Sequence, residues 1–379
     1  MKVALVAPSS PRCSSSLGRR VHDLARGLVR HGTDVEVVTQ DPEVRSPRTS
    51  ERDGVVTRYF PATTRGLGFA TSPGLWEHVR QGAETWDITH LHAGRAPFTV
   101  ATRGVAFATR RVTSRGLIFT PHAPIQRLLR WPYAPVVRAV IDRAARIVAL
   151  SGSEADLIRD LFPHAADRVL TLPLSVDAKA IEAAEPLDHA GEVVLAGGVL
   201  DRRTERVVAS MACVDPRFRL VVVGEGSAAR RLRRYAEDLH VSDRVDFVGR
   251  LTPSQHYRWL RTARVVVTLT DGEPSGSELL EALTAGAAVV AADVPVHREA
   301  AAVAGHLGVS LVEPECSPLE LADAIEAVAD DEPPPFTRLG IPSGEAAADT
   351  MLRLYRSLTG AEASEPAASA NGRPPVAHG

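Results

Sequence analysis

Two glutamates stand eight positions apart in the segment DGEPSGSELLEALTAG, where an apolar run passes into a helix-like stretch. Glu273 precedes the Ser/Gly turn, and Glu281 lies about one turn into the expected helix. A carboxylate offers two acceptor oxygens, which suits a pair of vicinal hydroxyl groups on a sugar or a ribose. A loop acid followed by a solvated helix residue gives the same spacing, so other parts of the chain must distinguish the two interpretations.

The turn between the two glutamates has the pattern of a helix start. Ser275 stands three residues before Glu278, as in a capping box that precedes an apolar helix. The N–H groups and the positive dipole end of such a helix favour a bound diphosphate. Gly276 would let the backbone approach a bulky ligand closely. The alternative is that Glu278 only caps the helix.

Strand-like apolar runs alternate with helix-period stretches through most of the chain. In the first helical stretch, residues 18–32, apolar side chains recur on one face and the pattern ends at His-Gly. Such alternation is typical of parallel sheets covered by helices. We expect two series of strands, at residues 3–8, 34–39, 87–92, 116–122, 146–151 and 168–173, and at 192–198, 218–226, 244–249, 263–270, 287–293 and 309–313.

The two series predict an α/β fold with two Rossmann-like, doubly wound domains that face a central cleft. Ligands of such sheets bind at the carboxyl ends of the strands. We expect an N-terminal domain at residues 1–180 and a C-terminal domain at 190–340. After a Pro-rich break, a helix at 341–359 is expected to pack back toward the N-terminal domain. The small, polar, Pro-containing tail at 360–379 is expected to be disordered.

Composition sets limits on the class of protein. The chain has 379 residues, which suits two α/β domains, and no apolar run approaches the ~20 residues of a membrane span. The first residues, MKVALVAPSS, favour a buried strand over a signal peptide. The cysteines are odd in number and far apart, which favours a reducing cytoplasm over a disulfide framework: Cys13, Cys213 and Cys316.

The charge is uneven. Residues 1–180 carry 25 Lys and Arg against 16 Asp and Glu, whereas the remainder carries 19 against 30. A basic half suggests an anionic partner, and arginines scattered over solvated faces are the alternative. We expect no nucleic-acid partner. A basic amphipathic stretch has two interpretations: a peripheral contact with the inner membrane face, or a helix with ordinary solvated arginines. The stretch contains Arg127, Arg130, Trp131, Tyr133, Arg138, Arg143 and Arg146.

The segment from Glu273 to Glu281, EPSGSELLE, resembles the E-x7-E signature of retaining glycosyltransferases of family 4, which have the GT-B fold. Other segments agree with that family in order and spacing: DITHLHAG, TPHAPIQRLLRWPYAPVVRAVIDRAARIVALSGSEADLI, LPLSVD and RVDFVGRLTPSQHYRWLRTARVVVTLT. The resemblance covers roughly residues 1 to 358, and it is specific for the family but not for a donor or an acceptor.

The resemblance implies a nucleotide sugar on the C-terminal domain and an acceptor on the N-terminal domain. Glu273 is then expected to hold sugar hydroxyls and stabilise the oxocarbenium-like centre. His122 matches a loop histidine near the anomeric carbon, and Glu281 is expected to bind ribose. His92 lies in the strand that borders the acceptor, although a structural role fits it equally well.

The resemblance also assigns the rest of the donor site. The amides of Ser277 and Glu278, beside Gly276, are expected to take phosphate oxygens. Arg250 lies where the backbone reads the base. No convincing Asp-x-Asp motif is present, so we expect no metal site, and no cofactor apart from the nucleotide sugar substrate, with UDP as the default.

Two departures from the family pattern affect the phosphate site. Arg203 can stand for the usual clamp lysine, but Gly198 occupies the usual arginine position, and Arg202 is expected to compensate. The glycine pair before the first helix is replaced by Ser15 and Ser16, of which Ser16 can hydrogen-bond phosphate. One lost guanidinium would weaken donor binding by about 1.5–3 kcal/mol.

The sequence therefore predicts a hexosyltransferase that acts with retention and without a metal on a small-molecule, glycan or lipid-head-group acceptor. An alternative is a non-catalytic GT-B protein that binds sugar nucleotides or a partner and has a weakened donor site. A nucleotide-sugar epimerase of the same fold is a third possibility. Donor base, sugar, acceptor and oligomeric state stay open.

Overall fold

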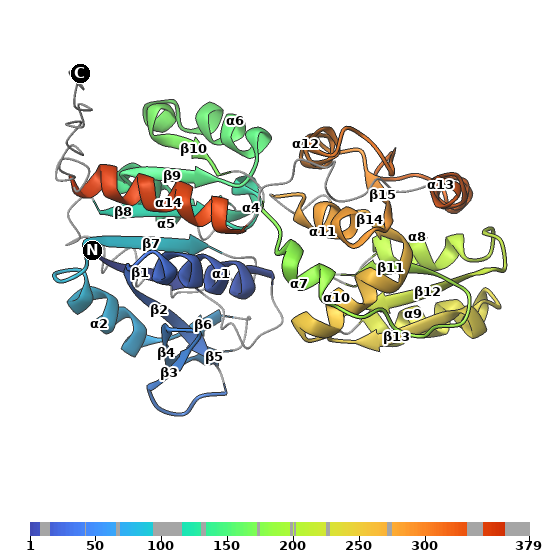
Figure 1. Cartoon of the computed structure of the whole chain (residues 1–379), viewed down its shortest axis with the longest axis horizontal. Coiled ribbons are helices and arrows are strands. Elements are labelled where there is room, and N and C mark those ends of the chain that lie inside the picture. Colours follow the sequence, from blue (N-terminus) through green and yellow to red (C-terminus); the bar gives the residue numbers. More distant parts are fainter. Residues whose placement is uncertain are drawn as a thin grey trace, which may run out of the picture.

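The computed structural model describes residues 1–7, 16–41, 43–65, 69–93, 116–129, 134–172, 175–197, 200, 202–224, 228–270, 275–331 and 344–360. Two twisted sheets, each covered by helices, lie side by side (Figure 1). The predicted pair of doubly wound α/β sheets is confirmed. The proposed domain limits stay a prediction, and the tail beyond residue 360 lies outside the described residues.

The N-terminal sheet has eight strands. Its inner strands are parallel and almost wholly buried, as expected when helices cover both faces. The order is β10 (Val169–Thr171), β9 (Arg146–Ala149), β8 (Leu117–Pro121), β7 (Ile88–Ala93), β1 (Lys2–Ala7), β2 (Asp34–Asp41), β4 (Val55–Pro61) and β3 (Arg48–Arg52). The short antiparallel pair β5 (Thr63–Arg65) and β6 (Phe69–Thr71) is separate.

The edge of this sheet was not predicted from the sequence. β3 pairs antiparallel with β4 around a turn in which Asp53 and Gly54 both have positive φ. β3 has the sequence RTSER and is almost wholly exposed, so it lacks the apolar alternation that reveals a strand. Such a charged edge strand discourages pairing with another chain.

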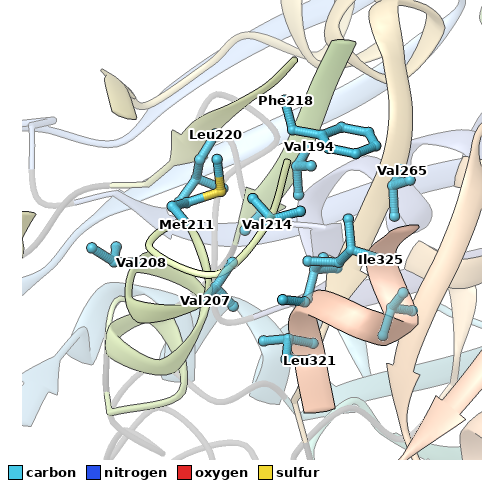
Figure 2. Close-up of a cluster of buried hydrophobic side chains, with 14 of the residues drawn as sticks. Val194, Val207, Val208, Met211, Val214, Phe218, Leu220, Val265, Leu321 and Ile325 are labelled. Atoms are coloured by element: carbon cyan, nitrogen blue, oxygen red, sulfur yellow. The ribbon is translucent and has the colours of Figure 1, made fainter. Parts of the chain in front are cut away.

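The C-terminal sheet has six strands, all parallel. The order is β13 (Val245–Gly249), β12 (Phe218–Val223), β11 (Glu192–Gly197), β14 (Ala263–Thr268), β15 (Ala288–Ala292) and β16 (Val309–Val312). Figure 2 shows the core on one face of this sheet, where strand residues meet those of α8 and α13: Val194, Leu220 and Val265 with Val207, Val208, Leu321 and Ile325.

The helices cover both faces of each sheet. Those of the N-terminal half are α1 (Ser16–Arg30), α2 (Pro73–Gly82), α4 (Ile125–Leu128), α5 (Ala134–Arg143), α6 (Gly152–Leu161) and the 3-10 turn η1 (Pro163–Arg168). The others are α7 (Ala178–Glu182), α8 (Arg202–Ser210), α9 (Ala228–Asp238), η2 (Ser242–Arg244), α10 (Pro253–Thr262), α11 (Ser277–Ala285), α12 (Pro295–Val303), α13 (Pro318–Asp330) and α14 (Gly344–Thr359).

The last helix, α14, packs along α1, on the N-terminal sheet (Figure 1). Gly27 of α1 permits this approach, because a Cβ atom there would lie 2.4 Å from the Cβ of Ala348. Tyr355 of α14 is fully buried in the same core cluster as Val3 and Leu5 of β1. Helix α14 therefore completes the hydrophobic core around β1.

The two halves also touch through α6 and α12. Glu299 of α12 accepts hydrogen bonds from the backbone N–H groups of Gly152 and Ser153, at 2.7 and 2.5 Å. These are the first N–H groups of α6, so a carboxylate from one half interacts favourably with the helix dipole of the other.

The basic stretch, for which membrane contact and solvated arginines were the two interpretations, includes α5. Its apolar residues Val137, Val140 and Ile141 are buried in the core, while Arg138 and Arg143 are exposed. Arg130, Trp131 and Tyr133 lie outside the described residues. Within the described ranges, no helix is long and apolar enough to cross a membrane.

Candidate functional site

In each sheet there is one point where successive strands of the chain begin to be added on the opposite side, and a ligand can bind at this point. In the C-terminal sheet β11 lies between β12 and β14, and in the N-terminal sheet β1 lies between β2 and β7. The crevice at the carboxyl ends of such strands is the usual ligand site of open α/β sheets. α11 follows β14 and therefore begins at this point, as does α8 after β11.

A cavity of about 750 Å³ lies between the two halves. Its walls come from α1, β7, the end of β8, the segment around α7, and the N-terminal parts of α10, α11 and α14. Four of the predicted site residues line it together: His92 and His122 from the N-terminal sheet, and Ser277 and Glu281 from α11.

The predicted capping box at α11 is wrong. The N-cap residue is Gly276, which has φ 57° and no side chain to cap the helix, whereas Ser275 is buried one residue earlier. The glycine is required by its positive φ and by its packing, because a Cβ atom would lie 2.9 Å from the Cβ of Ala300. Gly276 therefore packs tightly against α12.

Glu278 and Ser277 make different contacts at this helix start. The hydroxyl of Thr268, at the end of β14, donates to Glu278 Oε2 at 3.3 Å. Ser277 Oγ accepts a hydrogen bond from the guanidinium of Arg20, which belongs to α1 in the other half. The first residue of α11 is thus joined across the cleft to the N-terminal sheet.

Glu281 lies one turn farther along α11, and its side chain is 17% exposed. His256 of α10 is its partner, with Nε2 3.5 Å from Oε2. Burial raises the pKa of Glu281, but the bond to His256 and the charges of Arg19 and Arg20 outweigh this and lower the pKa to about 2. The carboxylate is therefore ionised at neutral pH, with acceptor oxygens at the cavity wall.

Three histidines, His90, His92 and His122, form a cluster on the opposite wall. His92 Nδ1 lies 2.9 Å from His122 Nε2, and the rings of His90 and His92 are 4.0 Å apart. His90 is held on both sides, by the hydroxyl groups of Tyr355 and Thr120, each at 2.7 Å. Within the described part of the chain, His92 Nε2 is buried without a hydrogen-bond partner.

The histidine cluster is neutral at physiological pH. Burial lowers the pKa of His92 to about 3. Burial, together with the nearby His92 and Arg20, holds the pKa of His122 well below its usual value. Neutral imidazoles can both donate and accept hydrogen bonds, so this wall suits hydroxyl groups better than a charged ligand.

The other predicted residues lie elsewhere. Arg202 and Arg203 occupy the first turn of α8, and Arg250 follows β13 directly. Among the described residues, the lining of the cavity does not include these three, Gly276 or Glu278. Ser16 is the first residue of α1. Glu273, Gly198 and Ser15 fall outside the described residues.

Sequence reasoning missed Arg19, Arg20, His256 and Tyr355. Arg19 and Arg20 stand in tandem near the start of the first helix, which is a usable signal for an anion site. His256 and Tyr355 carry no such signal, because their partners are 25 and 265 positions away and no short motif joins them. Over the described ranges, no group of three or more His, Cys, Asp and Glu side chains is arranged to hold a metal.

Two family models match consecutive parts of the chain. The model for Glycosyltransferase Family 4 matches residues 17–180, and that for Glycosyl transferases group 1 matches residues 179–339. The D-inositol 3-phosphate glycosyltransferase 1 of Catenulispora acidiphila is 29% identical over 89% of each chain. The phosphatidyl-myo-inositol mannosyltransferase of Mycobacterium tuberculosis is 25% identical over 97% of this chain and all of its own length.

Solved structures share the fold over nearly the whole chain. Sucrose-phosphate synthase from Thermosynechococcus elongatus has a TM-score of 0.75 at 21% identity and covers 95% of this chain and 99% of its own. Anabaena HepE in complex with UDP-glucose has a TM-score of 0.67 at 16% identity, over 96% and 100%. The chain thus belongs to glycosyltransferase family 4, has the GT-B fold and is a glycosyltransferase.

Proposed function

We propose that this enzyme transfers a hexose from a nucleoside diphosphate sugar, UDP-linked by default, to a hydroxyl group of an acceptor, with retention and without a metal. The observation that carries the proposal is the single cavity shared by the start of α11, Glu281 and His122. A helix start favours a diphosphate, an ionised carboxylate suits a ribose diol, and a neutral imidazole suits a sugar hydroxyl.

On the donor side, the amides at the start of α11, including those of Ser277 and Glu278, take the phosphate oxygens. Arg203 and Arg202 begin α8 at the neighbouring strand end and add positive charge, and Arg250 is the candidate for the base. This charge stabilises the leaving diphosphate, which is the role that a metal has in other transferases. The UDP-glucose complex of Anabaena HepE supports the choice of donor class.

On the reacting side, His122 hydrogen-bonds the transferred sugar near its anomeric carbon. Glu273 stands in the chain between β14 and α11 and is assigned to the sugar hydroxyls and the oxocarbenium-like centre. His92 contacts His122 and so borders the acceptor hydroxyl.

The acceptor is a small molecule, a glycan or a lipid head group that carries several hydroxyl groups. The names of the relatives, which include inositol 3-phosphate and phosphatidyl-inositol transferases, support a polyol. For a lipid acceptor, membrane contact at α5 would be electrostatic through Arg138 and Arg143, because the apolar face of this helix is buried.

Thermal unfolding with UDP, GDP, ADP and dTDP, each in excess EDTA, tests the donor site. A ligand of the native state raises stability by about 2.7 kcal/mol at a hundredfold excess over Kd. We expect stabilisation by one nucleotide, retained in EDTA and lost in Glu281→Ala. The exposed Glu237→Ala on α9 is the matched control and should respond as wild type does. No stabilisation by any of the four at millimolar concentration would refute the proposed donor site.

A further inference from the structure

The first turn of α6 is in contact with the C-terminal half. The N–H groups of Gly152 and Ser153 donate to Glu299 of α12, at 2.7 and 2.5 Å, and α6 and α12 lie next to each other where the two halves meet (Figure 1). A Cβ atom at position 152 would lie 3.3 Å from Glu299 Oε2, which is a tight contact. The glycine therefore leaves room for a carboxylate from the other half.

The same turn also holds the loop that carries His122. Glu154, the third residue of α6, is buried, and its Oε1 accepts a hydrogen bond from the N–H of Ile125 at 3.0 Å. Ile125 is the first residue of α4, and Pro124 before it has no side-chain group that could cap this helix. Glu154 thus supplies an acceptor that the start of α4 lacks.

The backbone around His122 is fixed at two points. The N–H of His122 donates to the carbonyl oxygen of Ala93, at the end of β7, at 2.6 Å. The bond from Ile125 to Glu154 holds the chain three residues later. Between these points Ala123 is buried and Pro124 has a restricted φ. The place of the His122 ring at the cavity therefore depends on both bonds.

The carboxyl group of Glu154 is not required for packing. Burial raises the pKa of Glu154 to about 7, although the bond from Ile125 lowers it. The neutral and the ionised form both keep an oxygen that can accept the Ile125 N–H. A methionine would fill a similar space without the cost of burying a polar group. The carboxyl group thus contributes the bond to the histidine loop, which an apolar side chain could not make.

We propose that Glu154 is a positioning residue for His122, and that Glu299 makes this positioning depend on the contact between the two halves. Residues 152–154 form one helical turn, so a displacement of α12 from α6 releases the turn that holds the Ile125 N–H. His122 is then held at the reacting centre only while the C-terminal half lies against α6. This inference rests on the proposed function and adds a connection from the contact of the halves to the reacting side chain.

The test measures kcat for release of UDP from UDP-glucose, with myo-inositol or water as the acceptor, and the Kd for UDP. Glu154→Met keeps the volume but removes the acceptor oxygen. We expect it to lower kcat about tenfold to hundredfold, because a small misplacement of a reacting group has an effect of this size. The Kd for UDP should stay at the wild-type value. Glu154→Gln retains an acceptor oxygen and should restore most of the lost kcat.

Glu299→Ala tests the connection between the halves. It should lower kcat, and combining it with Glu154→Met should lower kcat no further than Glu154→Met alone, because both act through the same turn. Glu320→Met is the matched control. Glu320 is the third residue of α13, accepts the N–H of Ser317 at 2.7 Å and does not line the cavity. Its loss also removes a bond at a helix start, but kcat should stay at the wild-type value.

An unchanged kcat in Glu154→Met, or an equal loss in Glu154→Gln, would overturn the role of Glu154. Additive losses in the double variant would overturn the connection through Glu299. Melting temperatures show whether each variant is folded, and if Glu154→Met is not, an unchanged kcat in Glu299→Ala overturns the inference instead. If His122→Ala keeps the wild-type kcat, the proposed function fails at His122 and this inference fails with it. If His122→Ala loses kcat and Glu154→Met does not, only this inference fails.

Discussion

The two walls of the cavity differ in charge. The N-terminal wall is the histidine cluster, in which burial and mutual hydrogen bonds keep the rings neutral. The opposite wall, where α11 meets the start of α1, combines Arg19 and Arg20 with the ionised Glu281. The histidine wall is thus neutral and the opposite wall charged, although Arg20 is close enough to His122 to help lower its pKa.

This difference matches the two ends of a nucleotide sugar. The diphosphate is the leaving group and needs positive charge placed in advance, where it costs no reorganisation during the reaction. The sugar and the acceptor carry hydroxyl groups, for which neutral donors and acceptors suffice. Substitutions on the two walls should therefore have separable effects, one on turnover and the other on nucleotide binding.

The largest effect is expected from His122→Ala. Loss of one positioned hydrogen-bonding group at a reacting centre typically costs about 10²–10³ in kcat. Nucleotide binding should change little, because His122 belongs to the neutral wall. Steady-state kinetics, together with titration of the nucleoside diphosphate, measure the two quantities.

His164→Ala is the control for this substitution. His164 is 57% exposed, pairs with Asp142 and does not line the cavity, so kcat should stay at the wild-type value. A His122→Ala enzyme that keeps its kcat but loses nucleotide affinity would reverse the assignment of the two walls.

A smaller and different effect is expected from Glu281→Gln. If Glu281 binds ribose, the neutral amide should weaken UDP and uridine by the same factor, about tenfold, because both ligands carry the ribose. Calorimetric titration of both ligands against wild type and Glu281→Gln measures the two factors. Weakening of UDP without weakening of uridine by Glu281→Gln would place the carboxylate away from the ribose.

The two walls should also respond to acid at different pH. The buried histidines have a folded-state pKa below 6.5, so the unfolded chain takes up their protons first and stability falls as pH drops below about 6.5. Each histidine contributes up to about 1.4 kcal/mol per pH unit. The contribution of Glu281, whose pKa is lowered from 4.5 to about 2, is lost only between those two values.

Chemical denaturation between pH 6 and 5 checks this difference. His92→Asn removes one of the three protons, so its unfolding free energy should fall less steeply with decreasing pH than that of wild type. Glu281→Gln should keep the wild-type slope over the same range. Identical slopes for wild type and His92→Asn would show that His92 is not held neutral by the fold.

The sequence predicted the sheets well because buried parallel strands are nearly continuous apolar runs. All strands of the C-terminal sheet coincide with such runs, whereas the polar strand β3 was not predicted. Gly276 was expected at the helix start for close approach to a ligand, which stays a prediction, but the packing that also requires a glycine was not predicted. Ala300, which crowds it, comes from α12, and no local pattern shows which helix will pack there.

The site was only partly predictable for a related reason. The family resemblance assigned the positive charge for the diphosphate to Arg202 and Arg203, which start a helix in the same half as Glu281. Arg19 and Arg20, which line the cavity and contact Tyr257 and Ser277, were not predicted; they come from the other half, more than 230 positions earlier in the chain. A contact across two sheets depends on how the halves are apposed, and spacing along the chain carries no such information.

The smallest expected effect tests how far the neutral wall extends. Tyr355→Phe removes the hydroxyl that bonds His90 Nδ1 at 2.7 Å, inside the core that α14 shares with β1. One ring nitrogen is then left buried without its partner, so the unfolding free energy should fall by about 1–3 kcal/mol while nucleotide affinity stays unchanged. Tyr235→Phe, on the partly buried face of α9, is the matched control and should cost less. A fall in kcat with Tyr355→Phe would mean that α14, through His90 and His92, also sets the position of His122, so that the end of the chain supports the reacting side of the cavity.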